Sequence, residues 1–77
     1  MSKLPMANFK KMDKLLRQLG FTAVRQKGSH AFYRHPDGRT TTLPNHGNRD
    51  FARPLIREIL REISISSDEF VKLLEEI

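Results

Sequence analysis

Cysteine is absent from the sequence, and no apolar run is long enough to cross a bilayer. Without cysteine the chain has neither a disulfide framework nor a thiolate metal site. A transmembrane helix needs ~20 predominantly apolar residues. The first residues, Met1-Ser2-Lys3-Leu4-Pro5, also lack the apolar core of a secretory leader. These absences predict a cytoplasmic protein without a membrane segment, and a length of 77 residues allows one domain.

Acidic residues are scarce in most of the chain, and the net charge is +5. Residues 1–57 hold 12 Lys and Arg against three acids, a net of +9, whereas residues 58–77 hold two against six, a net of −4. A basic body favours a polyanionic partner, because phosphate contacts supply most of the non-specific affinity for nucleic acid. Surface lysines also serve solubility alone, so charge does not decide the function by itself.

The spacing of apolar residues predicts a helix over residues 8–19. Asn8 is a suitable N-cap, and Gly20 is suited to the position after the last turn. The apolar stripe between them has the helical period and consists of Phe9, Met12, Leu15, Leu16 and Leu19. The lysines outside this stripe either form a solvated face or follow a phosphate backbone. Pro5 is assigned to a loose N-terminal arm.

Three strands and two further helices are expected after this helix. The strands are residues 22–27, 30–35 and 39–43, which are separated by short turns containing Gly28 and Gly38. The later helices cover about 53–63 and 66–77; Pro54 suits a first helical turn, and Ser66 with Glu69 forms a capping-box pattern. The order α-β-β-β-α-α predicts an α+β fold with a three-stranded antiparallel sheet, one face of which packs on helices.

The second strand alternates between two kinds of residue. With a period of two, His30, Phe32 and Arg34 share one face, and Ala31 and Tyr33 share the other. We assign Ala31 and Tyr33, with Thr41 and Leu43, to the face that packs on helices. The first set then faces solvent. The reverse assignment, with Phe32 inward, stays open at this point.

The solvent-facing set can supply RNA chemistry. His30 is suited to proton transfer near neutral pH, Phe32 to stacking on a base and Arg34 to a phosphate contact. The backbone amides of the Gly28-Ser29 turn can bind an anion, although this pair also fits an ordinary hairpin turn.

The other two histidines differ in their surroundings. His35 precedes Pro36 in a turn and is expected to be structural, and its odd spacing from His30 puts the two on opposite faces, which disfavours a metal site. His46 lies in the loop Asn45-His46-Gly47-Asn48 and is a second candidate, as a proton donor or an RNA contact, if the third strand runs back along the second.

Taken together, these residues resemble a known family. The sequence is similar to the HicA/YcfA-like mRNA interferase toxins of type II toxin–antitoxin pairs. The similarity covers nearly the whole chain in order, although each piece alone is weak. It is carried by Leu15-Leu16, Leu19-Gly20-Phe21, Arg25 to His30, Tyr33 to Arg39, Leu43-Pro44, His46-Gly47-Asn48, Leu55 to Leu60 and Ser66 to Phe70.

The resemblance implies a single HicA-like toxin domain over residues 1–77 with a double-stranded-RNA-binding-domain-like α-β-β-β-α fold and a short extra C-terminal helix. It implies translation-independent cleavage of mRNA, with the histidine of the Gly-Ser-His motif, here His30, as the catalytic residue and Gly28 as functionally important. The implied partner is a HicB-type antitoxin that covers the active site. Phe9 and Ser64 depart from the family pattern, since small residues and Gly are common at these positions.

The sequence therefore predicts a metal-independent and cofactor-independent endoribonuclease toxin. His30 is the general acid/base, and the expected RNA and phosphate contacts are Lys27, Gly28, Ser29, Phe32, Arg34 and His46. A non-catalytic RNA-binding module of the same fold is the alternative. A DNA-binding transcription regulator is disfavoured, because the last two helices become acidic and do not form a basic helix-turn-helix.

Overall fold

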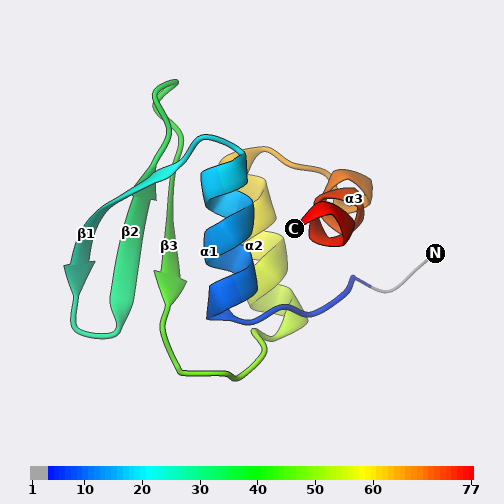
Figure 1. The fold of residues 1–77 in the computed structure, drawn as a ribbon, viewed down its shortest axis with the longest axis horizontal. Helices are drawn as coiled ribbons and strands as arrows, with labels where there is room; N and C mark the ends of the chain where they lie inside the picture. Colours follow the sequence, from blue (N-terminus) through cyan, green and yellow to red (C-terminus); the bar gives the residue numbers. More distant parts are fainter. Residues whose placement is uncertain (1–3) are drawn as a thin grey trace.

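The computed structural model describes residues 4–77 and confirms the expected order of elements. The helices α1 and α2 lie side by side on one face of the sheet, and α3 packs beside them (Figure 1). The chain therefore has the α+β, double-stranded-RNA-binding-domain-like architecture. The elements are α1 (Phe9–Gln18), β1 (Thr22–Lys27), β2 (His30–Arg34), β3 (Thr40–Pro44), α2 (Arg53–Ile63) and α3 (Ser67–Glu76).

The three strands form an antiparallel meander in the order β1-β2-β3. His30 pairs with Lys27 on one side and with Pro44 on the other. The pairing of β1 with β2 shifts between Ala23 and Arg25, which leaves Val24 as the extra residue of a β-bulge. The strand boundaries differ from the expected ones by one residue at β2 and β3, which is the usual uncertainty at element ends.

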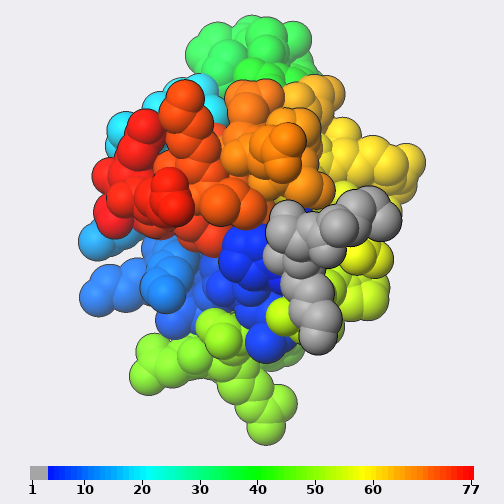
Figure 2. Space-filling view, turned by 90° about the vertical axis from the view of Figure 1, so that its right-hand side faces the viewer, coloured from blue at the N-terminus to red at the C-terminus, as the bar shows by residue number. Residues whose placement is uncertain are grey.

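The core lies between the sheet and the helices. Each amphipathic element contributes the stripe that its periodicity predicts: α1 buries Met12, α2 buries Ile59, and α3 buries Phe70. In Figure 2, α3 lies across the helix side of the molecule, over α1 and α2. Among residues 4–77, no helix combines the length and the apolar character that a membrane span requires.

The predicted helix ends are confirmed by their backbone geometry. The Lys11 N–H donates to Oδ1 of Asn8 (3.0 Å), and the Glu69 N–H donates to Oγ of Ser66 (3.1 Å). Gly20 follows α1 with φ +100°, and Ser64 follows α2 with φ +58°, the left-handed region that favours glycine. Ser64 therefore occupies a backbone position that favours glycine.

The expectation of a loose N-terminal arm at Pro5 was wrong for residues 4–7. Leu4 and Ala7 are buried in the core. The carbonyl of Leu4 accepts a hydrogen bond from Nε of Arg53 (2.6 Å), and the carbonyl of Ala7 accepts one from the Phe51 N–H (2.8 Å). Burial of two apolar side chains holds this segment without any regular structure. The expectation that the chain has no secretory leader concerns residues 1–5. Of these, residues 1–3 lie outside the described residues.

Candidate active site on the open face of the sheet

The face of β2 that points away from the helices carries the residues expected there. His30 and Arg34 are exposed and Phe32 is half-buried, whereas Ala31 and Tyr33 are buried on the helix side. The alternation predicted from the sequence is therefore confirmed, and the reverse assignment is excluded. Its physical cause is that only the small Ala31 and the aromatic Tyr33 can join the apolar core without leaving a charge buried.

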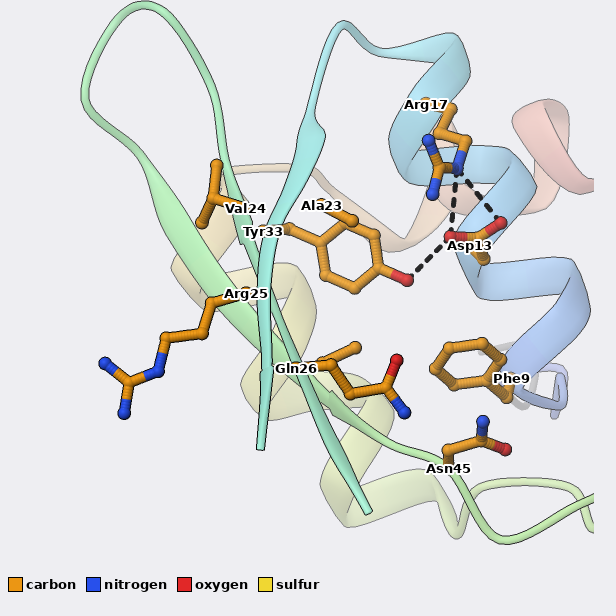
Figure 3. A pocket seen from close by; sticks show the side chains of 10 residues that line it. Phe9, Asp13, Arg17, Ala23, Val24, Arg25, Gln26, Tyr33 and Asn45 are labelled. Carbon is orange, nitrogen blue, oxygen red and sulfur yellow. Dashed lines mark hydrogen bonds and ion pairs between the residues drawn. The ribbon is translucent and has the colours of Figure 1, made fainter. Parts of the chain in front are cut away.

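Arg25 joins this face and was missed from the sequence. It pairs with Phe32 across the β1–β2 ladder, and its guanidinium carbon lies 5.4 Å from the centre of the Phe32 ring. A strict period of two would have placed Arg25 on the same face as Ala23, but the bulge at Val24 turns the two to opposite faces. Figure 3 shows Ala23 pointing toward α1 and Arg25 pointing away from it.

The Gly28-Ser29 turn connects Lys27 to His30, which are cross-strand partners. Gly28 has φ +60°, and the space where a Cβ would stand is open. A side chain at this position would be strained and would also project into solvent beside His30. The turn thus leaves its backbone accessible next to the candidate catalytic residue.

The loop that carries His46 is attached to the same turn. The N–H of Asn45 donates to the carbonyl oxygen of Ser29 (2.6 Å), and Asn45 follows Pro44, the partner of His30. The expectation that β3 runs back along β2 is confirmed. His46 is exposed at the start of the loop, so the structure brings its backbone to the end of the sheet where His30 lies.

His35 has a structural role, as expected. Its Nε2 lies 3.1 Å from the carbonyl oxygen of Leu19, which can only accept, so Nε2 carries the proton. Its Nδ1 lies 3.1 Å from the backbone nitrogen of Asp37 and 2.9 Å from Oδ1 of the same residue, and its ring meets Phe21 edge to face at 5.0 Å. Within the described range 4–77, no three side chains of the His, Cys, Asp and Glu types gather as metal ligands would.

The hairpin tip beyond His35 is held by charge. Asp37 accepts from the backbone N–H of Arg39 (3.0 Å) and from its Nε (2.7 Å). The backbone hydrogen bond first and the guanidinium second lower the pKa of Asp37 below its ordinary value, because both favour the carboxylate. Arg39 also lies over the ring of Phe21, which ties the tip to the core.

A groove opens on the other face of the sheet, between α1 and β1 (Figure 3). At its upper end the Tyr33 hydroxyl donates to Asp13 (2.6 Å), and Nε of Arg17 donates to both oxygens of the same carboxylate (3.1 Å each). Burial, followed by the bond to Asp13, raises the pKa of Tyr33 well above its ordinary value. Tyr33 therefore remains a neutral donor. This three-residue cluster was not predicted from the sequence, because Tyr33 lies 20 positions from Asp13 along the chain.

Residues 9–65 match the family model of the HicA toxins of bacterial toxin–antitoxin systems. The chain belongs to the HicA toxin family. The resemblance that its motifs indicated is therefore confirmed, and membership implies pairing with an antitoxin. No curated protein matches the chain.

The matched region contains the whole candidate site of this HicA family member. It includes β1 to β3, the Gly28-Ser29 turn and the loop of His46, and it ends before α3. Figure 1 shows that α1 and α2 both begin at the end of the molecule where the β1–β2 turn lies. The positive ends of two helix dipoles thus lie at the same end as Lys27 and Arg53, which makes this end favourable to anions.

Proposed function

We propose that this HicA family member is a metal-independent endoribonuclease that cleaves mRNA, with His30 as the general base. HicA toxins are generally ribonuclease toxins. The observation that carries the proposal is the placement of an exposed histidine beside a stacking aromatic and several cations on one open sheet face. Such a face provides a proton acceptor, a platform for a base and contacts for phosphate.

The reaction requires only groups that the chain carries. A neutral His30 nitrogen takes the proton of a ribose 2′-hydroxyl, and the 2′-oxygen then attacks the adjacent phosphorus. The bond from phosphorus to the 5′-oxygen breaks, and that oxygen takes a proton from an acid, for which His46 and the nearby basic residues are the candidates. The products are a 2′,3′-cyclic phosphate and a 5′-hydroxyl end.

The charge that develops on the phosphate oxygens needs donors that are already in place. Lys27 is the cross-strand neighbour of His30, and the Gly28 and Ser29 amides lie in the turn between them. Arg34 lies four residues beyond His30 on the same face, and Phe32, with the Arg25 guanidinium over its ring, lies between them where a base can stack. We assign phosphate binding to Lys27, Gly28, Ser29 and Arg34, and base stacking to Phe32.

The proposed partner is a HicB-type antitoxin that covers the open face of the sheet. In this proposal, residues 1–77 form a single toxin domain that acts on cytoplasmic mRNA. Covering His30 would block access of the 2′-hydroxyl without any change in the fold. A basic face is also complementary to an acidic protein surface, which speeds the encounter of the two proteins.

Replacing His30 tests the proposal directly. His30→Ala is expected to lower the rate of RNA cleavage by about 10²–10⁴-fold, the usual contribution of a general base. The fold should persist because His30 is exposed, and far-UV circular dichroism with antitoxin binding checks this. RNA with a single 2′-deoxy nucleotide at the cleavage site should also resist the wild-type protein.

Two results separate the proposal from a non-catalytic RNA-binding module. A binding module would leave transcripts intact when the chain is expressed alone, whereas the nuclease would degrade them and stop growth. Near wild-type cleavage by purified His30→Ala would remove His30 from the mechanism.

A further inference from the structure

The groove between α1 and β1, here called the α1–β1 groove, has a volume of about 470 Å³. This volume is in the range of small-molecule binding pockets. The groove lies on the helix side of the sheet, opposite the face of His30, and nothing in the proposed reaction uses it. Its lining includes Phe9, Asp13 and Arg17 of α1, Gln26 of β1, Tyr33 of β2, and Asn45.

The two ends of the groove differ in their free hydrogen-bonding capacity. At the upper end, Asp13, Arg17 and Tyr33 satisfy one another. At the lower end, the side-chain amides of Gln26 and Asn45 lie beside the ring of Phe9 (Figure 3). Within residues 4–77, the only hydrogen bond of these amides is a long one, from the Gly47 N–H to Oδ1 of Asn45 (3.4 Å). The lower end thus offers an aromatic surface and two amides with donors and acceptors to spare.

This lower end is next to His30 in the sheet register, although on the opposite face. Gln26 pairs with Ala31, the residue after His30. Asn45 follows Pro44, the partner of His30, and its N–H bonds to Ser29. Only β1 and the turn separate the two faces here, because β1 is an edge strand. Gly28 leaves open space at that edge, so a flexible chain can pass over it.

We propose that the α1–β1 groove binds an unpaired nucleobase adjacent to the scissile phosphate. The base stacks on Phe9, and its edge is read by the amides of Gln26 and Asn45. Amide side chains can pair with base edges because they carry a donor and an acceptor in one plane, and aromatic side chains are the usual platforms for single-stranded bases. This inference rests on the proposed ribonuclease function and adds a subsite that selects the cleavage position.

An extended peptide of a protein partner is the competing occupant of the groove. Such a peptide would add a strand to the free edge of β1. The bulge at Val24 interrupts that edge in its middle, and bulges of this kind oppose strand addition. A planar polar ring, in contrast, uses both features of the groove, because its face stacks on the Phe9 ring and its edge pairs with the free amides. The geometry therefore favours RNA.

The experiment uses short RNAs of one sequence that the wild-type protein cuts at one position. Each RNA carries one abasic nucleotide, moved along the positions flanking the cut, so that the base is lost and the backbone is kept. At one flanking position the abasic nucleotide is expected to raise KM about tenfold, with little change in kcat. A loss of this size is usual when a stacked base is removed. Equal KM values at every flanking position would overturn the proposal.

Variants of the groove identify the subsite. With intact RNA, Gln26→Ala and Phe9→Leu should raise KM as the abasic nucleotide does, and the abasic nucleotide should then have no further effect. Gln18→Ala is the matched control, because Gln18 is an exposed glutamine of α1 that does not line the groove, and it should behave as wild type.

Three other outcomes count against the subsite, and each is distinguishable. If the groove variants remain as sensitive to the abasic nucleotide as wild type, the base binds elsewhere. If they cleave RNA normally but lose affinity for the antitoxin, the groove is a protein-docking site. If wild-type protein cleaves no RNA at all, the proposed function fails and this inference fails with it.

Discussion

The three histidines illustrate how position in the fold assigns different roles to one residue type. His30 is exposed at the start of β2, His46 is exposed in the loop after β3, and His35 has both ring nitrogens bonded to backbone groups. Only His30 combines access from solvent with a basic cross-strand neighbour, Lys27. A change at His35 should therefore affect stability, whereas a change at His30 should affect chemistry.

His35→Ala is expected to lower the free energy of unfolding by about 1–3 kcal/mol, because it leaves the Leu19 carbonyl without its donor and removes the edge contact with Phe21. Urea unfolding followed by circular dichroism measures this loss. His46→Ala is the matched control and should change stability by less than ~0.5 kcal/mol, since its side chain is exposed. Equal losses in the two variants would contradict a structural role confined to His35.

At this scale the sequence correctly predicted the sheet face of residues in the regular strand β2, but it did not predict the face of residues beyond the β-bulge in β1. The period of two correctly separated His30 and Phe32 from Tyr33, because one face of β2 must be apolar to cover the core. Arg25 was missed because a bulge is not visible in an unaligned sequence, and it reverses the face of every residue beyond it. Gln26 and Asn45 were missed because their meeting depends on tertiary structure.

At the scale of elements, the helix ends follow closely from local chemistry. The N–H of Phe21 donates to Leu16 after α1, and the N–H of Ile65 donates to Leu60 after α2, so both helices end in the same motif. α1 uses glycine at the left-handed position, whereas α2 uses Ser64. A residue with a Cβ is strained there, and this strain predicts a stabilising substitution.

Ser64→Gly is expected to raise the free energy of unfolding by about 0.5–1 kcal/mol, because relief of backbone strain exceeds the greater entropy of glycine in the unfolded chain. A domain of this size gains about 4–8 °C in Tm for each kcal/mol, so calorimetry can resolve the change. Ser67→Gly, at the start of α3, is the control and should lower Tm. A lower Tm for Ser64→Gly would show that Ser64 makes a compensating interaction.

The N-terminal segment shows where element prediction fails. Residues 4–7 have no helical or strand period, so nothing in their sequence indicates order. Leu4 and Ala7 nevertheless pack in the core, and Phe51 and Arg53 hold their backbone. Such packing depends on groups that lie more than 40 residues away along the chain, as for Arg53 and Leu4. Local patterns cannot report it.

At the scale of the whole molecule, the basic and the acidic parts of the chain belong to different elements of the fold. The basic residues 1–57 include the sheet and the first helix, whereas the acidic residues 58–77 include α3. The family match ends at residue 65, so α3 lies outside it, yet Phe70 of α3 is fully buried in the common core. The helix thus completes the core, and its acidic surface lies outside the proposed RNA-binding face.

This division predicts how salt affects RNA binding. The His30→Ala protein, used so that RNA stays intact, should bind single-stranded RNA more weakly as salt rises, because each phosphate contact releases counterions. Arg34→Ala and Lys27→Ala should each reduce the slope of log K against log salt by about 0.7, the contribution of one phosphate contact on a single strand. Fluorescence anisotropy at several salt concentrations measures the slope.

Lys72→Ala on α3 is the matched control, because it removes the same unit of charge from outside the proposed face. Its slope should equal that of the unmodified His30→Ala protein. If Lys72→Ala reduced the slope as much as Arg34→Ala, RNA binding would depend on net charge alone, and the open face of the sheet would have no special role. If only the sheet variants change it, the RNA backbone follows the face that carries His30.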